Sequence, residues 1–109
     1  MPESFERGAL TEAVFYILLS LLQPMHGYAI MQNIESLTGG RVVLGPGTLY
    51  GAINALVKKG WIVAVGGDGD SRKKEYTITD TGKAVFLAEM DRLKELVTNG
   101  ECTLKEVRL

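Results

Sequence analysis

The sequence predicts a mainly α-helical fold that carries a small β-hairpin, an α+β arrangement. Apolar residues recur at helical spacing in four segments between residues 10 and 97. Two short β-prone runs, residues 61–65 and 74–79, follow the third of these segments and flank a glycine-rich turn. Three helices, a hairpin and one further helix form a winged helix-turn-helix with a C-terminal helix, an architecture typical of DNA-reading proteins.

The size and composition of the chain fit one globular domain. It has 109 residues, of which 46% are hydrophobic and 23% are charged, enough to bury its own core. A single cysteine, Cys102, excludes an intramolecular disulfide and is typical of a reducing compartment. The longest apolar run, residues 13–22, is too short to span a bilayer, and residues 1–8 lack the basic start of a signal peptide. We therefore expect a cytoplasmic protein that does not enter a membrane.

The first helix is expected over residues 10–22, where apolar residues run along two sides and Pro24 follows. One side has the 4-3-4 spacing of a helix face and consists of Leu10, Val14, Ile17 and Leu21. A helix that is apolar on two sides needs two partners. We therefore expect it to contact its own core on one side and a second subunit on the other.

The second helix is expected over residues 27–37, with Ile30, Ile34 and Leu37 turned inward. Gly39 and Gly40 end it, because glycine readily adopts the left-handed conformation that closes a helix. After these glycines, residues 41–44 form a short β-prone stretch and residues 45–47 a turn.

The third helix, expected over residues 48–59 and ended by Gly60, has two contrasting faces. The face expected to meet the core contains Leu49, Ala52, Ile53, Leu56 and Val57. The opposite face is small, polar or basic and has no acid; it contains Gly47, Thr48, Gly51, Asn54, Ala55, Lys58 and Lys59, with Tyr50 at its edge. Small residues let a helix approach base edges, and asparagine pairs with adenine. Tyr50 and the two lysines can hold phosphates.

The predicted hairpin lies in the basic part of the chain. Residues 41–74 carry six bases and two acids, although the whole chain has a net charge of -1. Three of these bases, Arg72, Lys73 and Lys74, lie at the base of the hairpin, where they can attract phosphate. The two acids, Asp68 and Asp70, are typical turn formers at the tip. The expected DNA contact is therefore the basic arm of the hairpin, whose returning strand has Tyr76 and Ile78 on one face.

The fourth helix is expected to begin at a Thr79 or Asp80 cap and to end near Val97, before Asn99 and Gly100. It contains a coiled-coil-like 4-3-4 seam of Phe86, Met90, Leu93 and Val97. A helix beyond the hairpin has little core left to cover, so this seam predicts a homodimer. The expected division is a DNA-binding domain over residues 1–79, a dimerisation helix over residues 80–98, and a tail of uncertain order over residues 99–109.

No residue pattern predicts catalysis. The single histidine, His26, and the single cysteine are far apart, so one chain cannot build a zinc site from them. The serines have no His and Asp companions, and the glycine pairs lack the lysine of a phosphate-binding loop. We expect a protein that is not an enzyme and that has no metal and no cofactor.

Three segments resemble the short members of the PadR family of transcriptional regulators. They are Leu-Gln-Pro-Met-His-Gly-Tyr-Ala-Ile at residues 22–30, Gly-Thr-Leu-Tyr-Gly-Ala-Ile-Asn-Ala-Leu at residues 47–56 with Lys-Gly-Trp-Ile at 59–62, and Arg-Lys-Lys-Glu-Tyr-Thr-Ile-Thr-Asp-Thr-Gly at 72–82. The resemblance covers residues 8–98. It implies a winged-helix homodimer joined by its first and last helices, a pseudo-palindromic operator, repression, and, in some relatives, release by a small aromatic or drug-like molecule. Trp61 and the acidic hairpin tip depart from the family pattern.

The sequence therefore predicts a sequence-specific regulator that binds double-stranded DNA as a homodimer. The residues expected to contact DNA are Gly47, Thr48, Tyr50, Gly51, Asn54, Lys58, Lys59, Arg72, Lys73 and Lys74. Those expected at the dimer interface are Leu10, Val14, Ile17, Leu21, Phe86, Met90, Leu93 and Val97. A small aromatic effector is expected against Phe15, Phe86, Met90 and Leu93. The alternative is a winged-helix protein-interaction or ligand-binding dimer that does not bind DNA.

Overall fold

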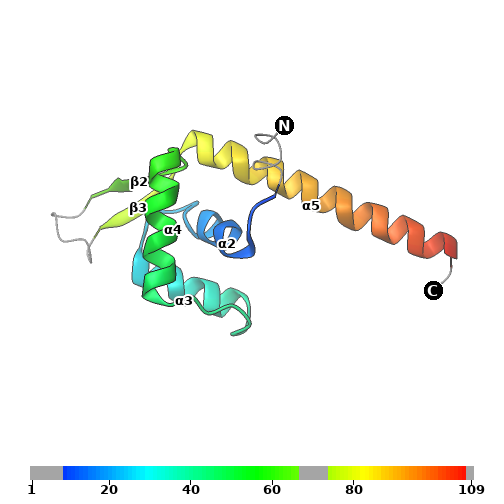
Figure 1. The fold of residues 1–109 in the computed structure, drawn as a ribbon, viewed down its shortest axis with the longest axis horizontal. Helices are drawn as coiled ribbons and strands as arrows, with labels where there is room; N and C mark the ends of the chain where they lie inside the picture. The colour runs from blue at the N-terminus through cyan, green and yellow to red at the C-terminus, as the bar shows by residue number, and fades with distance from the viewer. Residues whose placement is uncertain (1–8, 67–73, 108–109) are drawn as a thin grey trace.

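The structure, a computed structural model, describes residues 9–66 and 74–107. Its elements, in chain order, are α2 (Glu12–Ser20), β1 (Met25–His26), α3 (Gly27–Leu37), α4 (Pro46–Lys59), β2 (Ile62–Val65), β3 (Glu75–Ile78) and α5 (Asp80–Val107). Figure 1 shows α2, α3, α4 and the strands gathered at one end, while α5 extends away from them. The predicted fold class, mainly α with a small β-hairpin, is confirmed.

Helix α2 is shorter than predicted at both ends. It begins after Thr11, whose Oγ1 accepts a hydrogen bond from the Val14 N–H at 3.2 Å and so caps the helix. It ends at Ser20 because the carbonyl of Leu21 accepts hydrogen bonds from the Ile78 N–H and from the Thr77 hydroxyl. The chain therefore leaves the helix where it meets strand β3.

The sheet contains a strand that the sequence does not predict. Strand β1 pairs antiparallel with β3, with Met25 opposite Tyr76 and His26 opposite Glu75, so the strand order is β1-β3-β2. Two residues are too short to show the alternation that marks a strand. The β-prone residues 41–44 are not a strand. Instead the Val42 N–H donates to the Thr38 hydroxyl at 3.0 Å, at the end of α3.

Helix α3 has the predicted bounds, but one of its inward residues is wrong. Ile30 and Ile34 are fully buried, whereas Leu37 is 54% exposed because it lies in the last turn, past the edge of the core. Gly39 and Gly40 have φ values of 61° and 84°, the left-handed conformation expected after this helix.

Helix α4 begins two residues earlier than predicted. Residues 45–47 are not a free turn: Gly45 is the N-cap and Pro46 is the first helical residue, a position that tolerates the missing N–H. Gly60 ends the helix with φ 78°. Val57 was predicted to face the core but is 41% exposed, since it lies at the edge of the arc that Leu49, Ile53 and Leu56 bury.

Helix α5 is ten residues longer than the predicted helix and ends at Val107 instead of Val97. Asn99 and Gly100 lie inside it on an exposed surface, where a helical glycine costs only about 1 kcal/mol relative to alanine. The seam spacing continues past Val97 through positions 100, 104 and 107. The tail that was expected to be of uncertain order is therefore helical as far as Val107.

The core lies between α2, α3, α4, the first part of α5 and the inner face of the sheet. Its buried side chains are Ile17, Leu18, Leu21, Ile30, Ile34, Leu49, Ile53, Leu56, Ile62, Tyr76, Ile78 and Phe86. As predicted, Tyr76 and Ile78 lie on one face of β3 and point inward. Most of the predicted hairpin turn lies outside the described residues. None of the described helices is long and apolar enough to cross a membrane.

Candidate DNA-binding surface

The exposed face of α4 carries most of the residues predicted to contact DNA. Gly47, Thr48, Gly51, Asn54 and Lys58 are all exposed. They lie opposite the buried Leu49, Ile53 and Leu56, so packing within the chain leaves the whole face available. The N-cap, Gly45, has no side chain that could accept a hydrogen bond from the N–H groups at the start of α4. The helix thus presents a narrow, acid-free surface flanked by the sheet and by α3 (Figure 1).

Tyr50 has a packing role that its sequence position does not reveal. It is half-buried, and its hydroxyl oxygen lies only 2.3 Å from the place that a Cβ on Gly27 would occupy. Only glycine at position 27 leaves room for this ring at the start of α3. Tyr50 therefore fixes how α4 sits against α3, in addition to being a predicted phosphate contact.

The polar face of α4 divides into two parts. Ala55 and Lys59 line a hollow that α4 shares with Leu10 and Thr11, at the entrance to α2. Lys59 also lies over the ring of Trp61, with its Nζ 4.9 Å from the ring centroid. The lysine is therefore at the flank of α4, while Asn54 and Lys58 occupy the centre of the exposed face.

The base of the hairpin is attached to the start of α3 by His26. The Nδ1 of His26 lies 3.3 Å from the carbonyl oxygen of Lys74, and its Nε2 lies 3.6 Å from Oε2 of Glu75. His26 thus links β1 to β3. Lys74 is half-buried. Arg72, Lys73, Asp68 and Asp70 lie outside the described residues.

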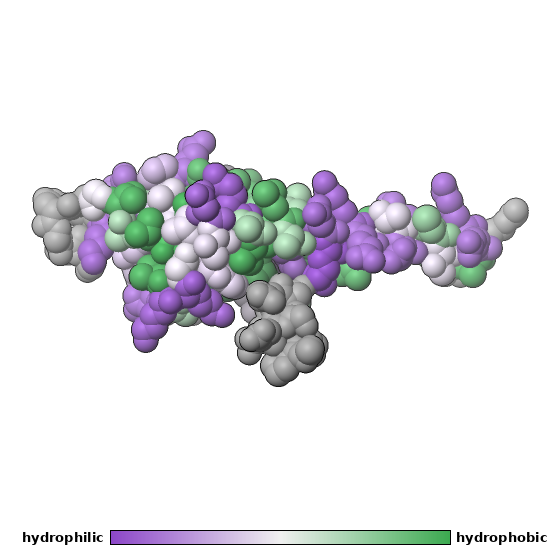
Figure 2. Space-filling view, turned by 90° about the horizontal axis from the view of Figure 1, so that it is seen from above, coloured by the Kyte–Doolittle hydropathy of each residue, from purple (hydrophilic) through white to green (hydrophobic). Residues whose placement is uncertain are grey.

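The predicted dimer interface separates into buried and exposed residues. Ile17 and Leu21 are fully buried and Phe86 is 6% exposed, so they belong to the core of the protomer and have almost no surface left for a second copy. Leu10, Val14, Met90 and Leu93 are half-buried. Val97 is exposed, and so are Leu96, Leu104 and Val107 on the part of α5 that extends beyond the body. Apolar residues lie among hydrophilic ones along this part in Figure 2.

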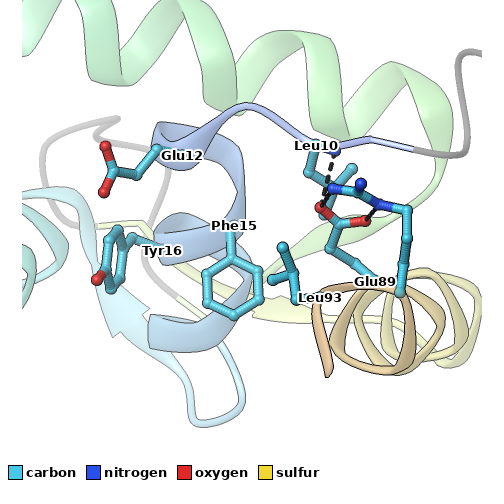
Figure 3. A pocket seen from close by; sticks show the side chains of 7 residues that line it. Leu10, Glu12, Phe15, Tyr16, Glu89 and Leu93 are labelled. Atoms are coloured by element: carbon cyan, nitrogen blue, oxygen red, sulfur yellow. Dashed lines mark hydrogen bonds and ion pairs between the residues drawn. The ribbon is translucent and has the colours of Figure 1, made fainter. Parts of the chain in front are cut away.

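A hollow of about 330 Å³ lies between α2 and α5. Figure 3 shows its lining, which consists of Leu10, Glu12, Phe15, Tyr16, Glu89, Arg92 and Leu93. Two of the four residues predicted for an effector pocket, Phe15 and Leu93, therefore line it. Phe86 instead stacks on Phe15, with ring centroids 5.0 Å apart. Met90 packs against the core.

Four residues of this hollow, Glu12, Tyr16, Glu89 and Arg92, were not predicted from the sequence, and two of them, Glu89 and Arg92, form an ion pair. The Arg92 guanidinium donates from Nε and Nη2 to the two carboxylate oxygens of Glu89, each at 2.7 Å. The Leu10 N–H donates to the same carboxylate at 3.2 Å, so Glu89 holds the N-terminal segment against α5 (Figure 3). Arg92 lowers the pKa of Glu89; burial opposes this effect and the Leu10 N–H supports it.

The stability of the protein should therefore depend on the charge of Glu89. A carboxyl group whose pKa is lowered in the folded state stabilises the fold at pH values above its ordinary pKa of 4.5. This contribution is lost as the pH falls through the pKa of the folded state. We expect Glu89→Gln to unfold at lower urea concentration than the wild type at neutral pH, and the gap to close as the solution is acidified. Glu95→Gln, at an exposed position of the same helix, should track the wild type. A gap that persists unchanged in acid would contradict this role of Glu89.

Among the described residues, no group of three or more His, Cys, Asp or Glu side chains could hold a metal ion. The described surface instead presents the exposed face of α4, with the positive charge of its lysine side chains. Such a surface is chemically suited to a polyanion.

Comparison with known proteins identifies the family. Residues 16–88 match the model of the transcriptional regulator PadR-like family. The chain belongs to this family. Members of this family are transcriptional regulators that bind DNA and are not enzymes.

Two solved structures show the same fold in similar proteins. A PadR family transcriptional regulator from Eggerthella lenta is 28% identical, with a TM-score of 0.64 and coverage of 85% of this chain and 80% of that one. A transcriptional regulator from Clostridium thermocellum is 27% identical, with a TM-score of 0.59 and coverage of 89% of both chains.

A curated relative is 34% identical over 86 residues, which is 78% of this chain. It is an uncharacterized 37.1 kDa protein in a transposon of Streptomyces fradiae, and this chain spans 24% of its length.

Proposed function

We propose that this PadR-like protein is a repressor that binds a pseudo-palindromic operator as a homodimer. The observation that carries the proposal is the exposed, acid-free face of α4, where Gly47, Gly51, Asn54 and Lys58 lie opposite the buried side of the helix. A helix with small residues at its centre can enter the major groove of DNA, and its flanking positive charge holds the phosphates.

Dimerisation is supported by the part of α5 that extends beyond the body. Leu96, Val97, Leu104 and Val107 are all more than half exposed, and none of the other helices and strands that the structure describes lies beside α5 at this end (Figure 1). Two copies related by a two-fold axis would cover the same stripe on each other. We infer a DNA-binding domain over residues 1–79 and a dimerisation helix that begins at residue 80 and includes the seam residues up to position 107.

The hollow between α2 and α5 is the site that we propose for a small aromatic effector. Phe15, Tyr16 and Leu93 offer apolar walls, and the Glu89–Arg92 ion pair offers polar groups. Because the hollow opens beside the proposed dimer interface, a ligand there would change how the two subunits are held relative to each other. Release of DNA would then follow from a changed distance between the two α4 helices.

The first variant that tests base reading is Asn54→Ala. An asparagine that pairs with an adenine edge contributes about 1–3 kcal/mol of discrimination, so the variant should bind the operator more weakly and prefer it less over other sequences. Fluorescence anisotropy with the operator and with single-base variants of it would measure both effects. A loss of the same size on every duplex would show that Asn54 does not read a base.

A second variant, Lys58→Glu, tests phosphate binding. Reversing this exposed charge should weaken binding to all DNA sequences and flatten the dependence of log affinity on log salt by roughly one unit for each contact removed. Lys105→Glu makes the same charge change at an exposed position near the end of α5 and should leave the salt slope unchanged. An unaltered slope in Lys58→Glu would exclude Lys58 as a phosphate contact.

The experiment that tests the proposed function as a whole is anisotropy with DNA from upstream of the protein's own gene. We expect selective binding relative to a scrambled duplex, weakened by salt, with two protomers bound to each operator. Weak and identical binding to both duplexes would favour the alternative, a winged-helix dimer that binds a protein or a ligand.

A further inference from the structure

A second hollow, of about 280 Å³, lies between the N-terminal segment and the side of α4 that carries Ala52, Ala55 and Lys59. Three parts of the chain line it: the N-terminal segment with the first turn of α2, one side of α4, and the residue that follows α4. These lining residues are Ala9, Leu10, Thr11, Val14, Ala52, Ala55, Leu56, Lys59 and Trp61. Only Leu10 also lines the hollow beside Glu89, so the two are separate places.

The hollow exists because α4 carries only small side chains where it faces the N-terminal segment. Ala52 and Ala55 lie one turn apart and present only methyl groups, while Trp61 supplies a half-buried aromatic wall. Its volume of about 280 Å³ is just below the roughly 300–1,000 Å³ of drug-sized pockets, so only a short molecule fits. Mostly apolar side chains therefore line an open space that no larger residue of α4 fills.

Lys59 places a positive charge at the rim of this hollow. Its Nζ lies 4.9 Å from the centroid of the Trp61 ring, a cation–π distance that restrains the lysine on this side of α4. No acidic residue is among the described residues that line the hollow. In the part of the site that the structure describes, apolar walls are combined with one cation, an arrangement that favours an anion with an apolar body.

We propose that this hollow binds a small carboxylate with an apolar tail, and that its occupancy weakens DNA binding by holding Lys59 away from phosphate. The tail lies against Leu10, Val14 and Trp61, and the carboxylate meets the Lys59 ammonium. The second half of the proposal rests on the proposed function, in which α4 enters the groove with its lysines at the DNA backbone. Linkage then requires that operator DNA weakens carboxylate binding by the same factor.

Trp61 makes carboxylate binding, the first half of the proposal, directly measurable, because it is the only tryptophan in the chain. Octanoate is the probe and 1-octanol is its neutral counterpart. We expect saturable quenching or shift of Trp61 fluorescence by octanoate at concentrations where octanol has a weaker effect. Along butyrate, hexanoate and octanoate, each buried methylene should tighten binding about fourfold, the equivalent of about 0.8 kcal/mol, until the hollow is full.

Two variants with matched controls locate the site. Ala55→Leu fills the hollow with a residue of similar helix propensity and should reduce octanoate affinity by roughly tenfold or more. Ala88→Leu makes the same exchange on an exposed position of α5 and should leave the affinity unchanged. Lys59→Gln should weaken octanoate about fivefold but not octanol, whereas Lys105→Gln should weaken neither.

Other occupants give different results. If octanoate acts only on a variant that lacks residues 1–8, the chain's own N-terminus fills the hollow; if only dilution to the monomer allows it, a second copy does. Each of these two results overturns the proposal. Equal binding of octanoate and octanol, or unchanged octanoate affinity in Ala55→Leu, also overturns it. Operator binding without octanoate tests the proposed function separately. Octanoate that binds at Trp61 but leaves operator affinity unchanged overturns the regulatory half alone.

Discussion

Replacing Gly82 with alanine is expected to lower the free energy of unfolding by about 3 kcal/mol. A Cβ at this position would lie 2.1 Å from the carbonyl oxygen of Trp61 and 2.9 Å from Cγ1 of Ile78. The carbonyl cannot move aside, because it accepts a hydrogen bond from the Thr79 N–H at 2.9 Å, and the Trp61 N–H donates to Leu56 at 3.0 Å. The first turn of α5 would therefore be pushed away from the end of α4.

Gly51→Ala is the matched control for this substitution. It lies inside helix α4 on the exposed face, with nothing beyond the local helix backbone within 4 Å of the place where a Cβ would stand, so it should raise stability by about 1 kcal/mol through helix propensity alone. Urea unfolding followed by circular dichroism would compare the two variants. A Gly82→Ala protein as stable as the wild type would show that α5 does not need this close approach to α4.

The elements that the sequence predicts best are those whose apolar spacing is long and local. Helix α3 has the bounds that its pattern and the following glycines indicate, and α4 differs only at its start, where Pro46 fits the first helical position as well as a turn. Strand β1 escapes prediction because two residues carry no period. It exists through its pairing with β3, a contact between distant parts of the chain. His26, for example, meets the carbonyl of Lys74, which is 48 residues away along the chain.

In the candidate site, too, local spacing predicts some features, while contacts between distant parts of the chain determine others. Periodicity places the exposed face of α4 correctly, because opposite sides of one helix follow from spacing alone. The pairing of Glu89 with Arg92 looks in the sequence like a pair of solvated charges three residues apart. In the structure Glu89 is buried while Arg92 keeps a third of its side chain exposed, and the Leu10 segment, 79 residues away along the chain, donates to the Glu89 carboxylate. The contact of Tyr50 with Gly27 likewise depends on how two helices meet.

A double substitution on the exposed seam, Val97→Asp with Leu104→Asp, is expected to abolish dimerisation while leaving the protomer folded. The two side chains are 58% and 51% exposed, so neither contributes much to the core of the protomer. In the proposed dimer each substitution would bury a carboxylate in place of an aliphatic side chain, and the two-fold axis would place both changes in both copies. Two carboxylates without partners in an apolar interface are far costlier than the contacts they replace.

Loss of the dimer should also weaken operator binding by roughly two to four orders of magnitude, because a monomer no longer gains from holding the second half-site at high effective concentration. Asn99→Asp with Cys102→Asp adds the same number of acids on the other side of the exposed part of α5 and should leave the protein dimeric. Sedimentation would give the mass, circular dichroism the helix content, and anisotropy the affinity. A dimeric Val97→Asp, Leu104→Asp protein would place the interface elsewhere. A monomer with undiminished operator affinity would instead show that one copy of α4 and its hairpin suffices to hold the DNA.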